Sequence, residues 1–277
     1  MSEAGNKAEE YSGVFAELYD VHPLYAARAD VAFYVDEARR AAEQCARSGE
    51  RAATPVLELG CGSGRVLLPT ARAGVNIVGL DLAETMLARL RAKLARESEE
   101  VQRRVRVTRS NMTDFALGET FALITTPFRA FQHLLRVEEQ LACLTCVKAH
   151  LAPGGRLILD FFHTLPAAMH DASFQEARED APWTPLPDGR SFHRTARIAE
   201  FHRATQTNVV EFFLYVRDAA GREEKFTERF PIRYFFHYEV EHLLARSGFR
   251  VTDVYGNFDR APFADDSPEM IVMAEAP

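Results

Sequence analysis

The sequence predicts a doubly wound α/β domain: a mostly parallel seven-stranded sheet with helices on both faces. Two observations predict it. From Thr54 onward, short apolar runs alternate with longer segments of helical periodicity, which is the pattern of strand–helix–strand units. A glycine-rich turn, residues 60–64, joins the first apolar run to the first helical segment. Open parallel sheets place their ligands at such turns.

The elements follow in order along the chain. The expected helices show apolar residues at helical spacing, and glycines at 74 and 248 end two of them. They cover residues 64–73, 83–96, 137–150 and 238–247. The expected strands are the apolar runs 55–60, 75–81, 105–109, 121–125, 156–162, 249–255 and 270–274.

Two segments depart from this alternation. Proline and Asp/Gly turn signals cluster in residues 181–189, and three segments with a period of two follow: 192–202, 208–217 and 222–235. They predict an antiparallel β ribbon or sheet inserted after the fifth strand. Residues 10–46 read as helices without strands and predict an N-terminal helical lid.

Composition limits the possible partners. The 277 residues are 47% hydrophobic and 26% charged, and 33 basic against 40 acidic residues give a net charge of -7. An acidic chain without a basic face is a poor binder of nucleic acid, so none is expected. Residues 1–10 are polar, and no uninterrupted apolar run is long enough for a membrane span. We therefore expect no membrane partner and a cytoplasmic location.

The cysteines and histidines do not indicate a metal. Cys143 and Cys146 form a CxxC pair, but it lies in an apolar helical stretch and lacks a second ligand pair. We interpret the two as helix residues that pack inward. With no other set at metal-ligand spacing, no metal is expected.

The most specific motif is the string LELGCGSGR, residues 57–65. Its glycines have the spacing G-x-G-x-G, whereas the dinucleotide fingerprint is G-x-G-x-x-G, and a P-loop would need Gly-Lys-Ser/Thr. With the preceding strand, VLELGCGSGR resembles the first motif of class I S-adenosylmethionine-dependent methyltransferases, which have a Rossmann-like fold. The resemblance implies S-adenosyl-L-methionine as cofactor.

Further matches occur in the family's order. Asp81, in GLDLAETML, stands where the family binds both ribose hydroxyls, and Met86 where an apolar residue lies against adenine. NMTDF, residues 111–115, resembles the adenine-contacting segment, although many relatives carry an acid in place of Asn111. LAPGGRLILDFF resembles the entry to the fifth strand. The N-terminal stretch YSGVFAELYDVHPLYAAR, residues 11–28, resembles a lid segment with a Tyr-Asp pair in small-molecule members of the family. In those proteins an arginine of this segment pairs with the methionyl carboxylate, and Arg28 is its counterpart here.

The resemblance thus implies a set of cofactor-binding residues from the lid and from the ends of the first four strands. The set is Tyr11, Tyr19, Arg28, Glu58, Gly60, Cys61, Gly62, Gly64, Arg65, Asp81, Leu82, Met86, Asn111, Met112, Thr126 and Phe128.

The segment after the fourth strand suggests the chemistry. It lacks the Asn/Asp-Pro-Pro-Tyr/Phe motif that presents acceptors to nucleobase or amide NH2 groups. FRAFQHL instead resembles the corresponding stretch of amino-sugar N-methyltransferases and glycine N-methyltransferase relatives, in which the histidine lies near the acceptor. His133 is therefore the first candidate base or orienting residue, with His163 second and Tyr19 of the lid third. Arg129 is expected to pair with an acidic substrate or with the cofactor.

The sequence predicts an S-adenosylmethionine-dependent methyltransferase acting on nitrogen or oxygen of a small-molecule acceptor. The alternatives are a cofactor-binding protein or cyclase without methyl transfer and, on weaker grounds, a nicotinamide-dependent oxidoreductase. The expected organisation is a lid over 1–50, a cofactor-binding core over 51–164, an insertion over 165–232 that serves as substrate cover or dimer contact, and a C-terminal part over 233–277 that completes the core. A homodimer is compatible with the insertion's apolar faces.

Overall fold

The computed structural model describes residues 13–26, 28–48, 54–164, 169 and 171–276. The chain divides into two compact units. The core unit is Ala29–His163 with Phe235–Pro277, and the insert unit is Met1–Arg28 with Thr164–Tyr234.

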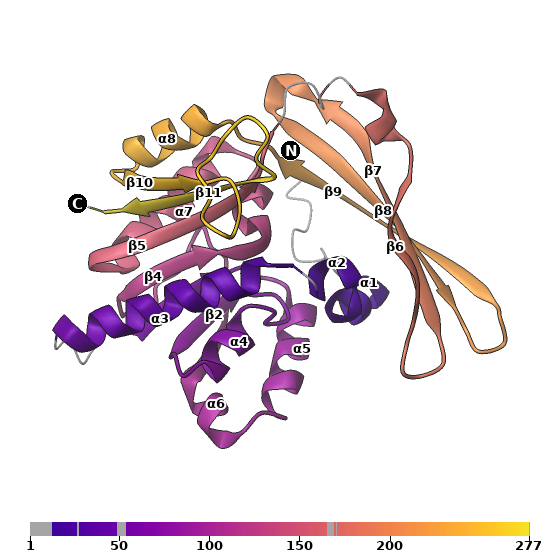
Figure 1. The fold of residues 1–277 in the computed structure, drawn as a ribbon, viewed down its shortest axis with the longest axis horizontal. Helices are drawn as coiled ribbons and strands as arrows, with labels where there is room; N and C mark the ends of the chain where they lie inside the picture. Colours follow the sequence, from indigo (N-terminus) through magenta and orange to yellow (C-terminus); the bar gives the residue numbers. More distant parts are fainter. Residues whose placement is uncertain (1–12, 27, 49–53, 165–168, 170, 277) are drawn as a thin grey trace, which may run out of the picture. The chain divides into compact units, whose positions relative to one another are not determined.

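A seven-stranded sheet forms the core unit, in the order β10-β11-β5-β4-β1-β2-β3 (Figure 1). β1 to β5 are parallel to one another, while β11 runs antiparallel to both β5 and β10. The strands are β1 (Thr54–Leu59), β2 (Ile77–Asp81), β3 (Val105–Arg109), β4 (Phe121–Thr126), β5 (Leu151–Phe162), β10 (Arg250–Tyr255) and β11 (Glu269–Glu275). The predicted fold class, a mostly parallel doubly wound sheet, is confirmed.

Apolar side chains leave the sheet alternately on both faces, and helices cover each. On one face, α3, α4, α5 and α6 bury side chains against Val56, Ile77 and Leu123. On the other face, α7 and α8 pack against Leu57 and Ile124. The helices are α3 (Asp30–Ser48), α4 (Leu67–Arg72), α5 (Glu84–Leu94), α6 (Glu99–Arg104), α7 (Val137–His150) and α8 (His237–Arg246), with the 3-10 turn η3 (Pro127–His133) after β4.

The position of β1 determines where a ligand can bind. β1 pairs with β4 on one side and β2 on the other, so the chain order reverses there. Open α/β sheets bind ligands beyond the carboxyl ends of the strands at this switch point. The loops after β1, β2 and β4 are therefore where a ligand is expected to bind.

The insert unit is an antiparallel sheet of four strands, in the order β6-β7-β8-β9, with short helical segments. Its strands are β6 (Arg178–Pro185), β7 (Ser191–His202), β8 (Thr207–Arg217) and β9 (Glu223–Arg233). Phe192 and Leu214 on one face share a small apolar cluster with Leu18. The helical segments are α1 (Gly13–Leu18), η2 (Tyr19–Val21), α2 (Pro23–Ala26), η5 (Ala172–Gln175) and η6 (Arg203–Thr205).

Two elements differ from the sequence prediction. Residues 181–189 read as turns, yet Arg178–Pro185 is strand β6. β6 is an edge strand with register shifts against β7, and prolines such as Pro182 and Pro185 are tolerated in edge strands and at bulges. Helix α6 was not predicted, although Ser98 accepts the N–H of Val101 as its N-cap.

The first fifty residues are divided between the units. Residues up to Arg28 belong to the insert unit, whereas α3 belongs to the core unit. The reason is that α3 buries Phe33, Tyr34, Ala38 and Ala41 in the core cluster that includes β1. The predicted lid boundary at residue 50 and the unit boundary at Arg28 thus differ by one long helix.

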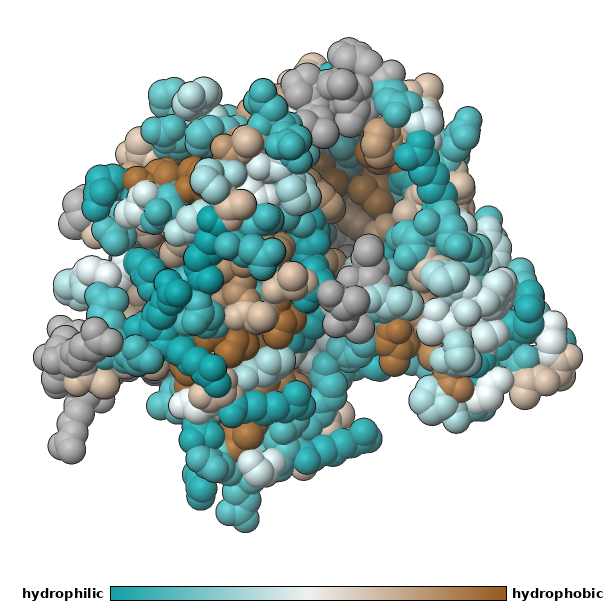
Figure 2. Space-filling view, viewed as in Figure 1, coloured by the Kyte–Doolittle hydropathy of each residue, from teal (hydrophilic) through white to brown (hydrophobic). Residues whose placement is uncertain are grey.

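Polar side chains cover most of the visible face of the core unit, with small apolar areas between them (Figure 2). Among the described residues, no helix is both long and apolar enough to cross a membrane.

Candidate cofactor and active site

The glycine-rich loop folds back against the neighbouring strand β2. The amides of Gly60 and Cys61 both donate to the carbonyl of Leu80, at 2.7 and 3.0 Å. Gly60, Gly62 and Gly64 all have positive φ, which side chains disfavour. A Cβ at Gly60 would lie 2.6 Å from the Cβ of Ala130, so the post-β4 turn packs directly on the loop. The glycines therefore provide both the turn and the close approach.

Asp81 ties this loop to the end of β2. Its Oδ2 accepts the amide of Gly62 at 2.7 Å, and its Oδ1 accepts the amide of Ala83 at 2.9 Å. Burial raises the pKa of Asp81, while the amide hydrogen bonds and nearby His133 act in the opposite direction. Each carboxylate oxygen has a further lone pair, so Asp81 can also accept hydrogen bonds from a diol.

Glu58 is on β1, two residues before Gly60 of the loop, and is almost fully buried. Its Oε2 has no hydrogen-bond partner among the residues that the structure describes. Burial raises the pKa of Glu58 to about 8, with Asp81 and Asp30 adding to the shift and Arg65 opposing it. A buried carboxyl of this kind is suited to a cationic or hydrogen-bonding ligand group.

Arg65, which follows the last glycine of the loop, is held by a carboxylate of α3. It forms a two-pronged ion pair with Asp30 at the start of α3, at 2.7 and 2.6 Å, and Asp30 is fully buried. Its guanidinium also lies 4.8 Å from the centre of the Phe128 ring. Arg65 was predicted to bind the cofactor, and its side chain is engaged by Asp30, a residue that sequence reasoning missed.

These charges fit S-adenosylmethionine. The carboxylates of Asp81 and Asp30 both lie within electrostatic reach of Glu58, against the single positive charge of Arg65. An excess of negative charge favours a ligand that carries a sulfonium and an ammonium. No group of His, Cys, Asp and Glu in the described part of the chain could hold a metal ion.

The other cofactor candidates lie beside the loop or further along the sheet edge. The methyl of Met86 would lie 3.4 Å from a Cβ at Gly62, and that of Met112 would lie 3.7 Å from one at Gly60. Asn111 is exposed and accepts the amide of Thr113. The remaining members are the buried side chains of Cys61 and Thr126 and the half-buried side chain of Leu82.

Both histidine candidates of the core lie beyond the carboxyl ends of β4 and β5. His133 is close enough to Asp81 to influence its ionisation. His163 contacts the carbonyl oxygen of Ser267 through Nδ1 at 2.7 Å, so Nδ1 carries the proton and the neutral ring has its lone pair at Nε2. The two segments are joined because the Gln132 side chain accepts the amide of Phe162 at 2.9 Å.

Arg129 is held by a partner inside the core unit. It is buried, and its Nη2 donates to both carboxylate oxygens of Glu269 of β11, at 2.9 and 2.8 Å. An internal carboxylate therefore takes the guanidinium, and the expected pairing with an acidic substrate or with the cofactor stays a prediction. Glu269 lies 140 residues from Arg129, and no local pattern links them.

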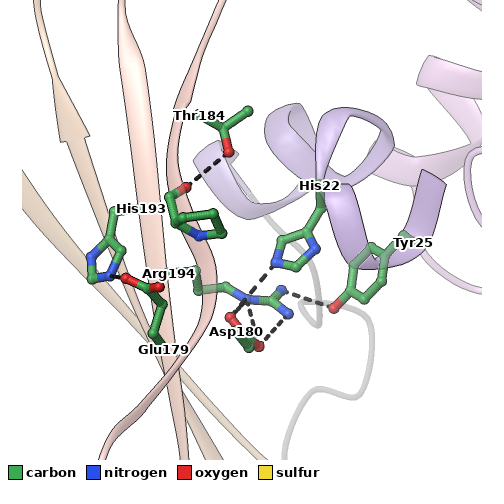
Figure 3. Close-up of polar contacts among 8 residues, drawn as sticks. His22, Tyr25, Glu179, Asp180, Thr184, His193 and Arg194 are labelled. Atoms are coloured by element: carbon green, nitrogen blue, oxygen red, sulfur yellow. Dashed lines mark hydrogen bonds and ion pairs between the residues drawn. The ribbon is translucent and has the colours of Figure 1, made fainter. Parts of the chain in front are cut away.

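A separate polar cluster lies inside the insert unit (Figure 3). Arg194 is buried, pairs with Asp180 and donates to the Tyr25 hydroxyl at 2.8 Å. The His22 ring stacks on Tyr25 with centroids 4.4 Å apart, and its Nε2 lies 3.7 Å from Asp180. Burial is the main cause that lowers the pKa of His22. Of these side chains, those of His22, Tyr25 and Arg194 border a small pocket.

The lid candidates belong to this unit. Tyr19 lines the pocket and packs on Tyr25 with ring centroids 4.8 Å apart. Arg28 is half-buried at the end of the unit's first segment. Tyr11 lies outside the described residues. The predicted contacts of all three with the cofactor stay predictions.

Replacement of Asp81 by asparagine is expected to weaken S-adenosylmethionine binding about 10- to 100-fold, because a charge-assisted hydrogen bond contributes about 1.5–3 kcal/mol. Calorimetric titration measures the affinity, and thermal melting checks the fold. The exposed Asp253 provides a control: Asp253→Asn should bind like the wild type. Wild-type affinity in Asp81→Asn would contradict the assigned role.

Glu58→Gln is expected to change how stability depends on pH. Because the folded-state pKa of Glu58, about 8, exceeds the ordinary glutamate pKa of 4.5, the carboxyl contributes stability below pH 4.5 that is lost as pH rises toward 8. Glutamine does not ionise. The stability of the variant relative to wild type should therefore grow between pH 5 and pH 8 by on the order of a few kcal/mol.

Urea denaturation of the ligand-free proteins at both pH values measures this difference. A difference that is the same at pH 5 and pH 8 would show that Glu58 ionises normally in the folded protein.

Comparison with known proteins agrees with this geometry. Residues 56–155, from β1 into β5, match the family model described as "Methyltransferase domain". A cypemycin N-terminal methyltransferase of a Streptomyces species is 27% identical over 220 residues, 79% of this chain and 82% of that protein. The dTDP-3-amino-3,6-dideoxy-alpha-D-glucopyranose N,N-dimethyltransferase of Streptomyces fradiae is 33% identical over 158 residues, 57% of this chain and 56% of the relative.

A solved structure extends the likeness to nearly the whole chain. The amino pentose methyltransferase of Micromonospora echinaspora, solved with S-adenosylmethionine bound, aligns with a TM-score of 0.65 at 26% identity and covers 95% of this chain and 97% of that one. The matched segment contains the glycine-rich loop, Glu58 and Asp81. The protein is therefore a class I S-adenosylmethionine-dependent methyltransferase of the small-molecule type.

Proposed function

We propose that the protein transfers the methyl group to an amine nitrogen of a small molecule, and that an amino sugar is the first acceptor class to test. One observation carries the proposal: His133 lies within electrostatic reach of Asp81, so a titratable base stands beside the predicted ribose site. The relatives named above support nitrogen over oxygen, since their names describe an N,N-dimethyltransferase for an amino sugar and an N-terminal methyltransferase.

The proposed chemistry divides into binding and proton transfer. S-adenosylmethionine supplies an electrophilic methyl group on a sulfonium. Asp81 accepts hydrogen bonds from the ribose hydroxyls, the loop from Gly60 to Gly64 approaches the cofactor closely, and Glu58 offers its second oxygen to the cationic portion. The enzyme's main contribution is alignment of the two reactants and exclusion of water.

A base is needed because amines are mostly protonated at neutral pH and only the neutral form has a lone pair to donate. We assign this task to His133 as acceptor-orienting residue or base, with His163 Nε2 as the second candidate. Tyr19 remains a candidate from the insert unit. The cofactor contacts of Met86, Met112, Asn111, Thr126 and Phe128 are likewise part of the proposal.

The insert unit is proposed to supply acceptor-binding residues, as substrate cover or dimer contact, with the pocket beside His22 and Arg194 as its candidate surface. A cytoplasmic location, a homodimer and the absence of nucleic-acid and membrane partners stay predictions.

Paired acceptors test the acceptor atom. The protein is incubated with S-adenosylmethionine labelled in its methyl group and with dTDP-3-amino-3,6-dideoxyglucose or the same sugar nucleotide bearing a 3-hydroxyl. We expect label on the amine alone. Label on the hydroxyl compound in preference would overturn nitrogen as the acceptor atom, and no transfer to either would exclude this sugar class.

His133→Ala is expected to lower the transfer rate at pH 7 about 100-fold, in the range of general-base effects, with recovery as pH rises toward the pKa of the amine. Affinity for S-adenosylmethionine should not change. His242→Ala, an exposed histidine on α8, is the matched control. A variant of His133 with the wild-type rate and pH profile would remove it from the mechanism and favour His163.

A further inference from the structure

The turn after β4 has an unfavourable backbone. Phe128 and Arg129 are consecutive residues with left-handed conformations, at φ 56° and 65°. Non-glycine residues adopt this region rarely, because their side chains are strained there. Two in succession persist only where other contacts hold them.

Those contacts come from the strands beside the turn. The amide of Arg129 donates to Asp160 Oδ1 of β5 at 2.9 Å, and both residues are buried. The guanidinium reaches β11, where Glu269 binds it with both oxygens. It also covers the ring of Phe162 at 3.5 Å from the centroid. Arg129 thus joins three neighbouring strand ends.

The next residue is where the turn meets the cofactor loop. Ala130 occupies the space where a Cβ at Gly60 would lie, at 2.6 Å. The Phe128 ring lies near two guanidiniums, 4.8 Å from that of Arg65 and 5.7 Å from that of Arg129. A shift of the turn would therefore change the space above Gly60 and the side chain of Arg65 together.

We propose that Arg129 is a positioning residue for the cofactor: its anchorage to Glu269 and Asp160 holds residues 127–133 in the left-handed turn that packs on Gly60. It contributes to S-adenosylmethionine affinity through the turn. The same anchorage fixes the start of η3, the segment that ends at His133. Through it, Arg129 affects the position of the proposed base as well as the binding of the cofactor.

The protein contains a close internal control. Arg260, in the loop between β10 and β11, also has a left-handed conformation, at φ 63°. It binds the buried Glu37 at 2.7 Å and also pairs with Asp36, and its guanidinium lies 5.0 Å from the ring centre of Phe33. These partners are all on α3. Arg260→Met removes a similar set of contacts away from the turn.

The experiment compares Arg129→Met and Arg260→Met by calorimetric titration with S-adenosylmethionine, below the melting temperature of both. Arg129→Met should raise the Kd about 10-fold, the size expected from the release of one strained turn, and Arg260→Met less than about 2-fold. Amide hydrogen exchange of residues 127–133 should accelerate in the first variant only. Arg129→Lys, which keeps the charge without the planar fork, should fall between wild type and Met.

Equal changes of Kd in the two methionine variants, or no change in Arg129→Met, would overturn the proposal. If Arg129→Met does not fold, Glu269→Gln decides: it keeps the shape and weakens the anchorage, so Kd and exchange of the turn should both rise. Wild-type Kd and exchange in Glu269→Gln would contradict the assigned role.

Discussion

The Asp81 carboxylate connects the two strand ends on which the candidate site depends. Its hydrogen bonds reach Gly62 in the loop after β1 and Ala83 in the loop after β2, so one side chain holds both loops in register. The parallel pairing of β1 with β2 places these loops side by side, and the glycines let the first loop lie flat against the carbonyl of Leu80. Without this carboxylate, the amide of Gly62 would lose the acceptor that fixes the middle of the loop.

Buried charge is the second constraint on the site. Burial of an unpaired ion is costly, so charged groups at the sheet edge are expected to be paired or neutral. Arg65 pairs with Asp30 through two nitrogens, and Arg129 pairs with Glu269 through one nitrogen that contacts both oxygens. Both guanidiniums lie near the Phe128 ring. Glu58 follows the other route, because burial favours its protonated form. Glu58 is therefore a buried acid at the edge of the sheet that can lose its proton when a cationic ligand binds beside it.

Much of the architecture could be predicted from local pattern. The strands from β1 to β5 and helices α5, α7 and α8 follow their apolar periodicity to within a few residues, and the glycine spacing identified the ligand loop. Strand β6 was missed because its prolines are typical of turns, and only its place at the edge of the sheet makes them acceptable. Proline as a turn signal is a rule about local sequence, whereas the edge position of β6 is a property of the whole sheet.

The anchors of the site could not be predicted for the same reason. Asp30, Asp160 and Glu269 act through partners 31 to 140 residues away in the chain, and single-sequence periodicity contains no information on such pairs. The sequence pointed to Arg129 as a charged residue near the site, but the expected partner was a ligand, whereas the partner in the structure is Glu269 of β11. The left-handed turn at Phe128 was also invisible, since neither residue in it is a glycine or an asparagine.

The most direct test of this account is a crystal structure of the protein with S-adenosylhomocysteine. We expect both ribose hydroxyls to lie within hydrogen-bond distance of the Asp81 carboxylate, and the amino acid portion to lie above Gly60 beside Glu58. A product bound elsewhere on the protein, or bound at this edge with the ribose turned away from Asp81, would contradict it.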